Sequence, residues 1–191
     1  MNRRVALSIL LVAVVILVLG LLFWGPWGRG SSSGLASDPG QSLGSGDSNL
    51  ISATLYFPGP DGKLHSEQVE TSSGSPEKRI RGLVEQLLAG PRNRRLWSAF
   101  PEGVELAAVY LGTEPVAYVD LHRRDSGPPP AAGSLQETLA IFSLVNSVVL
   151  NVSEVERLVL LWNGNQRASF AGHVDTGQAL GPRLSLVAGH S

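Results

Sequence analysis

One uncharged run constrains this chain more than any other feature. Residues Val5–Trp24 read VALSILLVAVVILVLGLLFW and contain no charged side chain. About 20 helical residues at about 1.5 Å each span the hydrocarbon core of a bilayer. Arg3 and Arg4 precede the run, and the positive-inside rule places such a basic end in the cytoplasm. We therefore expect a transmembrane anchor over residues 1–27, with the remainder of the chain outside the cytoplasm.

A cleaved signal peptide is the alternative interpretation of this N-terminus. The apolar part of a signal peptide is shorter, roughly 7–15 residues, and ends at a small-x-small cleavage site. Here the run is longer, and Leu-Leu-Phe-Trp at residues 21–24 stands where that site should be. The sequence therefore favours an uncleaved anchor. Because the chain contains no cysteine, a lipid-modified N-terminal cysteine and a disulfide framework are both excluded.

The composition changes twice after the apolar run. Glycine and serine dominate residues 25–49, which bury too little apolar surface to offset the entropy of ordering the chain. We expect a disordered linker over residues 28–49. From Leu50 onward apolar and β-branched residues return, so the globular domain is expected over residues 50–191. A domain of this size buries roughly two-thirds of its unfolded surface, which is sufficient for one core.

The first part of the domain predicts a β-hairpin followed by a helix. Ile51–Phe57 and Lys63–Glu70 have strand patterns and flank the turn sequence Pro58–Gly62. Ser75-Pro76 supplies an N-cap and a proline for the first helical position, and Gly90-Pro91 is a helix stop. The apolar face of this helix consists of Ile80, Leu83, Val84, Leu87 and Leu88.

A second hairpin and a second helix are expected next. Val104–Gly112 and Pro115–His122 alternate as strands on either side of a short turn. After an irregular loop at residues 123–133, Ser134 and Glu137 form the pattern of a capping box, in which each side chain bonds to the backbone N–H of the other residue. The apolar positions of this helix are Leu135, Leu139, Phe142, Val145 and Val149.

A last strand pair completes the domain. Val155–Trp162 is strongly apolar, turns at Asn163–Gln166 and is expected to return through Arg167–His173. The predicted order is ββ-α-ββ-α-ββ. This order favours an α+β domain with its helices packed on one face of a mostly antiparallel sheet.

The loop after the first helix is the strongest candidate for a binding surface. The whole chain has 15 Lys and Arg against 16 Asp and Glu, which disfavours a general polyanion-binding protein, and a loop outside the cytoplasm does not meet nucleic acid. One interpretation is a solvated helix end, with cations favoured by the helix dipole and Leu96, Trp97 and Phe100 in the core. The other is a surface for a lipid head group, a wall polymer or an acidic protein. The residues concerned are Arg92, Arg94, Arg95 and Trp97.

Catalytic patterns are weak. His173 and Asp175 stand two residues apart in GHVD, so on a strand they would face the same side and could belong to a Ser-His-Asp set. No serine is marked by a nucleophile-elbow motif, and no histidine pair has metal-ligand spacing. We therefore expect no catalytic, cofactor-binding or metal-binding residues.

Several stretches in order resemble the GerMN domain, the sporulation and spore germination family. They are LYFPGPDGKL (55–64), LVEQLLAGP (83–91), SAFPEGVELAAVYL (98–111), AYVDL (117–121), SLQETLAIFSLVNSVVLNVSEVERLVLLWNG (134–164) and GHVD (172–175). The resemblance implies a compact α/β module related to ring-building motifs of secretion and sporulation channels. Such domains occur on extracytoplasmic lipoproteins and membrane proteins and beside cell-wall amidases. The resemblance carries no catalytic residues. This chain has one copy of the domain and an apolar run in place of a lipid-attached cysteine.

Together these observations predict a bacterial inner-membrane protein held through residues 5–24, with its C-terminal domain periplasmic or otherwise extracytoplasmic. We expect a non-catalytic domain that serves protein interaction or assembly, through an envelope partner or self-association. A peptidoglycan-binding or wall-polymer-binding module is the alternative. A cell-wall hydrolase using His173 and Asp175 is the second alternative.

Overall fold

The computed structural model describes residues 49–190, so the predicted anchor and nearly all of the predicted linker lie outside the described residues. The order ββ-α-ββ-α-ββ is confirmed. No helix within residues 49–190 is both long enough and apolar enough to cross a membrane. The elements are β1 (Leu50–Pro58), β2 (Leu64–Ser72), α2 (Pro76–Ala89), β3 (Val104–Leu111), β4 (Val116–Arg123), α3 (Ser134–Val149), β5 (Arg157–Trp162), β6 (Asn165–Gln166) and a short 3-10 helix (Leu184–Leu186).

The first hairpin forms a two-stranded sheet by itself. β1 and β2 pair antiparallel along their full length, from Leu50 opposite Ser72 to Pro58 opposite Leu64. Alternate side chains of a strand face opposite sides, and in β1 this sends Leu55 and Phe57 into the core. The predicted hairpin is therefore confirmed.

The remaining strands form a second, mixed sheet in the order β3-β4-β5-β6. β3 and β4 are antiparallel, whereas β4 and β5 are parallel. The parallel pair follows from the chain order, because α3 carries the chain back to the end where β4 began. Three of the four strand pairs are antiparallel, as expected, but the expectation of a single sheet is wrong. The α+β class holds, with two sheets in place of one.

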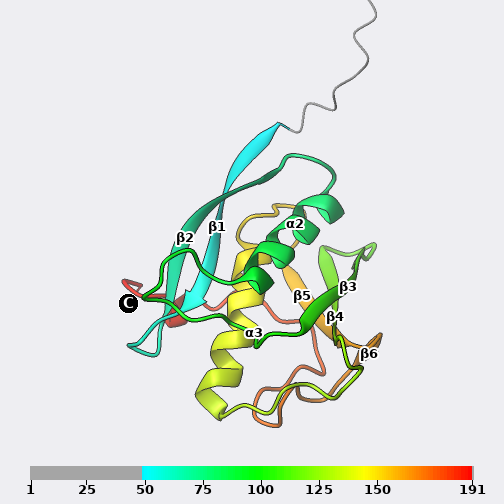
Figure 1. The fold of residues 1–191 in the computed structure, drawn as a ribbon. Helices are drawn as coiled ribbons and strands as arrows, with labels where there is room; N and C mark the ends of the chain where they lie inside the picture. The colour runs from blue at the N-terminus through cyan, green and yellow to red at the C-terminus, as the bar shows by residue number, and fades with distance from the viewer. Residues whose placement is uncertain (1–48, 191) are drawn as a thin grey trace, which may run out of the picture. The chain divides into compact units, whose positions relative to one another are not determined.

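Helix α3 lies between the hairpin and the mixed sheet, while α2 packs against β3 and α3 (Figure 1). From Leu139 to Val148 every residue of α3 is buried. A helix covered on several sides needs apolar residues around much of its circumference, which the sequence IFSLV supplies. Leu135, predicted on the apolar face, lies in the first turn and is 58% exposed.

Three polar residues of α3 and its C-terminal extension close the outer edge of β1. We call Ser143, Ser147 and Asn151 the α3 polar row. The Ser143 hydroxyl donates to the Tyr56 carbonyl, and the Tyr56 N–H donates to Ser147 Oγ at 3.0 Å. Asn151 Oδ1 accepts from the Thr54 N–H at 2.8 Å, and Asn151 Nδ2 donates to the Thr54 carbonyl at 2.7 Å. Spaced four residues apart, these side chains share a helix face and satisfy the backbone groups that a neighbouring strand would otherwise satisfy.

The end of α2 is set by Gly90, as the Gly-Pro stop predicts. Gly90 has φ 91° and ψ 172°, a conformation essentially restricted to glycine, and its N–H donates to the Leu87 carbonyl at 3.2 Å. A Cβ at this position would lie 2.8 Å from Ser98 Oγ. At the other end Ser75 occupies the N-cap position before Pro76, but its side chain makes no capping bond.

Gly90→Ala is expected to lower the free energy of unfolding by about 1–3 kcal/mol, because alanine is strained at this φ and ψ. Gly181 is the matched control, since its φ is not positive and a Cβ there meets no atom within 4 Å. Urea unfolding of the full-length chain, followed by tryptophan fluorescence, checks the difference. Equal stability of the Gly90→Ala and Gly181→Ala variants would contradict it.

The predicted return strand over residues 167–173 is wrong. β6 comprises only Asn165–Gln166, after which the chain leaves the sheet. Phe170 turns into the core, where its ring meets Phe100 edge-on at 6.1 Å and Trp162 at 5.3 Å between centroids. After Gln166 the chain thus packs the Phe170 side chain on Trp162 of β5 and does not extend the backbone ladder.

Candidate functional site

The loop between α2 and β3 presents its basic and aromatic residues to solvent. Arg92, Arg94 and Arg95, here called the loop arginines, are all exposed, and Trp97 is 56% exposed. The interpretation that placed Trp97 in the core is therefore wrong, although its neighbours Leu96 and Phe100 are buried. Among the ion pairs that residues 49–190 form, none involves a loop arginine.

The backbone of this loop is held at both ends by hydrogen bonds. The Glu67 carboxylate on β2 accepts from the N–H groups of Arg92 and Asn93, each at 3.0 Å. Asn93 Oδ1 accepts from the Arg95 N–H at 3.0 Å. The Trp97 N–H donates to the Pro58 carbonyl at the end of β1, at 2.9 Å. The exposed side chains thus project from a fixed backbone.

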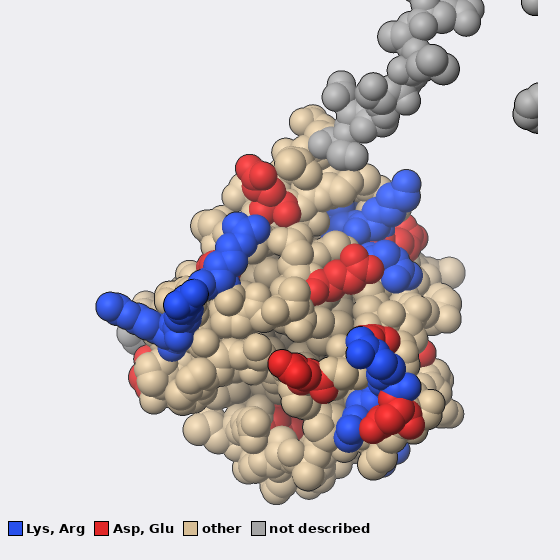
Figure 2. Space-filling model, viewed as in Figure 1, with Lys and Arg blue, Asp and Glu red and all other residues tan. Residues whose placement is uncertain are grey.

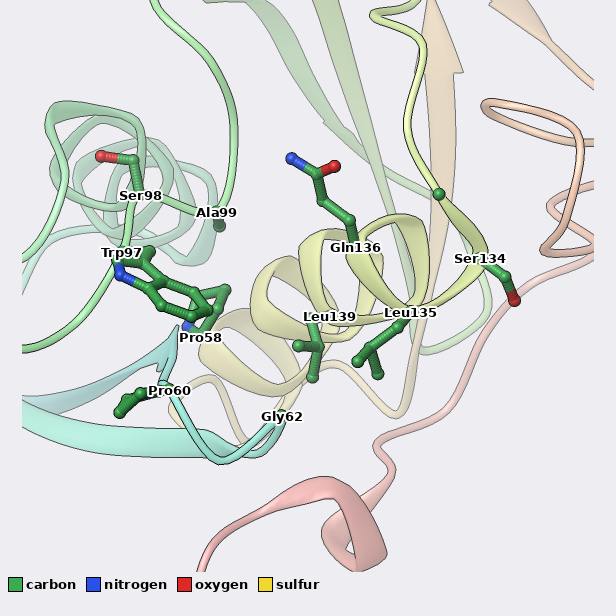
Figure 3. A pocket seen from close by; sticks show the side chains of 11 residues that line it. Pro58, Pro60, Gly62, Trp97, Ser98, Ala99, Ser134, Leu135, Gln136 and Leu139 are labelled. Carbon is green, nitrogen blue, oxygen red and sulfur yellow. The ribbon is translucent and has the colours of Figure 1, made fainter.

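Trp97 forms one wall of an apolar groove of about 680 Å³. We call it the Trp97–Leu135 groove. In Figure 3 the indole ring lies beside Pro58, while Leu135 and Leu139 project from the first turns of α3 on the other side. The three segments that meet here are the β1–β2 turn, the α2–β3 loop and the N-terminus of α3. The lining residues are Pro58, Pro60, Gly62, Trp97, Ser98, Ala99, Gly133, Ser134, Leu135, Gln136 and Leu139.

Few polar side chains face into the groove. Of its lining residues only Ser98, Ser134 and Gln136 carry polar side chains. The hydroxyls of Ser98 and Ser134 both point away from the space between Trp97 and Leu135 (Figure 3). The groove therefore offers apolar contact area and few side-chain hydrogen bonds. Its volume lies in the range of small-molecule and side-chain pockets, about 300–1,000 Å³.

Positive charge gathers along one edge of the same face. Figure 2 shows Lys and Arg side chains at the left of the view, where the α2–β3 loop crosses β2 in Figure 1. At the lower right of the same view, basic and acidic side chains are interspersed. Elsewhere in the domain, Arg123 pairs with Asp125 and Arg124 with Glu105. The basic edge beside the groove is therefore local, and the chain as a whole carries a formal net charge of −1.

His173 and Asp175 do not form the pair that a hydrolase would need. His173 Nδ1 donates to the Glu137 carboxylate at 2.9 Å, whereas the Asp175 carboxylate accepts from the Gly177 N–H and Gln178 Nε2. His173 lies in a bend and Asp175 in an isolated β-bridge with Ser169, so the two residues do not belong to one regular strand and the spacing of two does not put them on one face. His173 instead helps to bind the C-terminal loop to α3.

Glu137 is the centre of that attachment and was not predicted. Its side chain is completely buried and accepts from the N–H groups of Ala171, His173 and Val174 at 2.8, 2.9 and 3.2 Å. Burial raises the pKa of Glu137, but the hydrogen bonds from Ala171, Val174 and His173 outweigh it and hold the pKa below its ordinary 4.5. The predicted capping box is wrong, because α3 begins one residue early, with Gly133 at the N-cap and Ser134 already helical.

Two other acidic groups have local structural partners. Asp120 on β4 is buried, and its Oδ1 accepts from the Gly164 N–H at 2.9 Å, which fixes the β5–β6 turn. Asp61 accepts from His65 Nε2 at 2.9 Å, and this hydrogen bond lowers the pKa of Asp61. Within residues 49–190 no three His, Asp or Glu side chains cluster as a metal site would require.

Sequence reasoning found the loop but missed the other walls of the groove. Pro58 and Leu139 belong to a strand and a helix whose apolar residues all look like core. The exposure of Leu135 could have been inferred from the sequence. A leucine in the first helical turn, just after Gly133 and Ser134, lies beyond the packed part of the helix. No feature of the sequence indicated the role of Glu67, because a glutamate on an alternating strand is ordinarily a solvated residue.

Comparisons with known proteins agree with the fold. The model of the family described as sporulation and spore germination matches residues 54–168. No curated protein matches the chain. Among solved structures, a protein from Clostridium perfringens described as a candidate lipoprotein has a TM-score of 0.51 and 17% identity, over 73% of this chain and 93% of that one.

Two structures of the sporulation protein GerM from Bacillus subtilis also share the fold. The first GerMN domain alone has a TM-score of 0.50 and 14% identity, over 69% of this chain and 97% of that chain. The tandem GerMN domains have a TM-score of 0.52 and 13% identity over 70% of this chain. This chain covers 46% of the tandem, about half its length. At these identities the likeness concerns the fold alone.

Proposed function

Because the chain belongs to the sporulation and spore germination family, we propose that it is a non-catalytic envelope protein whose GerMN domain binds another protein or further copies of itself. The observation that carries this proposal is the exposed Trp97 at the rim of an apolar groove, beside three arginines that form no ion pair within residues 49–190. Tryptophan and arginine are the residues most enriched where binding energy concentrates in protein interfaces.

The titratable groups that could take part in catalysis form structural hydrogen bonds, which supports a non-catalytic role. His173 and Glu137 join the C-terminal loop to α3, and Asp120 holds the β5–β6 turn. The Glu137 carboxylate holds His173 Nδ1 as an orienting carboxylate would, but within residues 49–190 no serine or other nucleophile hydrogen-bonds to the His173 ring. The most suggestive catalytic residues of the sequence are thus accounted for by folding.

The proposed location rests on the sequence alone. The uncharged run of residues 5–24, preceded by Arg3 and Arg4, supports a single-pass anchor in the bacterial inner membrane with the domain periplasmic or otherwise extracytoplasmic. A domain held there acts on partners within reach of the membrane surface. Assembly near the membrane is therefore the class of function that we propose.

One observation favours a second candidate, which is binding to peptidoglycan or another wall polymer. The exposed ring of Trp97 offers a face on which a sugar could stack. The groove beside it has few side-chain hydroxyls or amides to bind sugar hydroxyls, so we rank this function below protein binding.

In-cell photo-crosslinking of the full-length protein tests the proposal. A benzophenone amino acid is placed singly at exposed apolar positions on different elements, namely Tyr110, Leu135, Leu150 and Leu184. Affinity purification and mass spectrometry then identify the adducts. We expect one dominant envelope protein, or the protein itself, at one or more positions. Wall fragments alone, or no protein adduct at any position, would refute the proposal.

A further inference from the structure

We propose that the Trp97–Leu135 groove binds a linear, acidic peptide segment of a partner protein. One large apolar side chain of the segment enters the groove, and neighbouring carboxylates pair with the loop arginines. This inference rests on the proposed function, because it names the kind of partner that the domain binds.

The apolar contact comes from side chains that the fold leaves uncovered. Six large apolar side chains are exposed within residues 49–190, and two of them, Trp97 and Leu135, stand on opposite sides of this groove. Between them Leu139 and Pro58 are buried at the base. An apolar side chain of the partner would cover both exposed residues at once, and apolar burial contributes about 25 cal/mol per Å².

The loop arginines have no carboxylate partner within residues 49–190. Arg79, Arg81, Arg123 and Arg124 are ion-paired within the domain, but the loop arginines are not. The Glu67 carboxylate, which contacts this loop, is already engaged by the N–H groups of Arg92 and Asn93. Because no carboxylate of the described residues pairs with the loop arginines, they can bind the carboxylates of a partner, and guanidinium groups do so with two parallel hydrogen bonds.

The loop is also prepared for binding. Its backbone is fixed by Glu67 and by the Pro58 carbonyl, so little further ordering is needed when a ligand arrives. Surfaces ordered in advance bind more tightly because less conformational entropy is lost on association.

The shape and chemistry of the groove favour a peptide over the other occupants. A bilayer surface is broad and cannot enter a concave space between Trp97 and Leu135. A glycan needs many hydrogen-bonding side chains, and the lining residues supply few. An extended peptide can present one apolar side chain and neighbouring carboxylates within a few residues. Trp97 and the loop arginines likewise lie together on one short segment, residues 92–97.

The test is selection from a phage-displayed library of random linear dodecapeptides. The target is the full-length chain in non-ionic detergent, and bound phage are counter-selected on the Trp97→Ala variant. We expect enriched peptides with one aromatic or large aliphatic residue flanked by two or more Asp or Glu. The synthetic consensus peptide, measured by fluorescence anisotropy, should bind less tightly as the salt concentration rises.

Matched variants separate the site from general effects. Trp97→Ala should weaken binding at least about tenfold, whereas Tyr110→Ala, an aromatic residue equally exposed at 56%, should leave it unchanged. Replacing all three loop arginines with serine should also weaken binding at least about tenfold. The control replaces three other exposed arginines with serine and so removes the same amount of charge; these are Arg81, Arg157 and Arg167. The control should change the affinity for the peptide less than twofold.

Glu67→Ala tests the prepared loop separately. This substitution adds no negative charge and leaves every groove side chain in place. We therefore expect the affinity for the peptide to fall by about threefold to tenfold, because the loop backbone is less ordered. Glu70→Ala, on the same strand and without bonds to the loop, is its control. Unchanged melting temperatures of the variants with changed exposed side chains confirm that the fold is retained.

Several outcomes would overturn the inference. One is a library with no enrichment, and another is a set of peptides that lack acidic residues or bind the Trp97→Ala variant equally well. Displacement of the peptide by soluble dihexanoyl phosphatidylglycerol, or by soluble peptidoglycan fragments, would assign the groove to lipid or wall polymer. A protein adduct in cells at Tyr110 but not at Leu135 would leave the proposed function standing while rejecting the groove. Absence of any protein adduct would reject the proposed function itself.

Discussion

Replacing Glu137 with alanine is expected to lower the free energy of unfolding by about 3–5 kcal/mol. The variant removes the acceptor of the Ala171, His173 and Val174 N–H groups and of His173 Nδ1, and these donors lie against a side chain with no solvent exposure. Urea unfolding of the full-length chain measures the loss. Glu114→Ala, on an exposed turn, is the control and should change the stability by less than about 0.5 kcal/mol.

The same carboxylate predicts how stability depends on pH. The folded-state pKa of Glu137 lies below the ordinary value of 4.5 expected in the unfolded chain. Its contribution to stability is therefore fully present above pH 4.5 and is lost as the pH falls through the folded pKa. Glu137→Gln, which is isosteric but cannot ionise, should be less stable near neutral pH and should show a shallower acid limb. An acid limb as steep as that of the wild type would mean that other groups carry the dependence.

Asn151→Ala is expected to cost about 2–3 kcal/mol, because it removes hydrogen bonds to both backbone groups of Thr54 and to the Ser147 carbonyl. Asn151→Asp keeps one acceptor oxygen but places its other oxygen against two carbonyl oxygens, so it should cost at least as much. Asn165→Ala, which loses only a local contact to Asn163, is the control.

Amide hydrogen exchange locates the effect of these variants. The N–H of Thr54 loses its acceptor in Asn151→Ala, whereas the N–H of Tyr56 keeps Ser147 Oγ. Faster exchange is therefore expected first at Thr54. A stability loss without faster exchange at Thr54 would show that Asn151 acts elsewhere.

The sequence predicted those parts of the fold that depend on local chemistry. Gly90-Pro91 ends α2 because the backbone there requires glycine, and the hairpin of β1 and β2 follows from alternation around a Pro-Gly turn. The element order was likewise readable, because each element carried its own periodicity. The division into two sheets was not, since it depends on α3 side chains occupying the β1 edge across a long sequence separation.

The candidate site was also predictable only in part. The loop arginines and Trp97 form a contiguous motif, so their exposure on one loop could be proposed from the sequence, although their role as an interaction surface stays a prediction. Glu137 could not be identified, because its position matched a capping box and its true partners lie more than thirty residues away. A sharper signal was available, since Glu137 shares a helical stripe with Ile141, Leu144 and Val148, all completely buried.

The α3 polar row links two sheets that share no strand. Because α3 packs on β5 and also satisfies the backbone of β1, neither sheet can lose its helix without exposing the other. Separate opening of the hairpin would break the hydrogen bonds of the polar row and expose the apolar side chains of β1. Separate opening of the mixed sheet would expose the apolar side of α3. We therefore expect the domain to unfold as one cooperative unit, and a pulling force applied at β1 to be resisted by both sheets through α3.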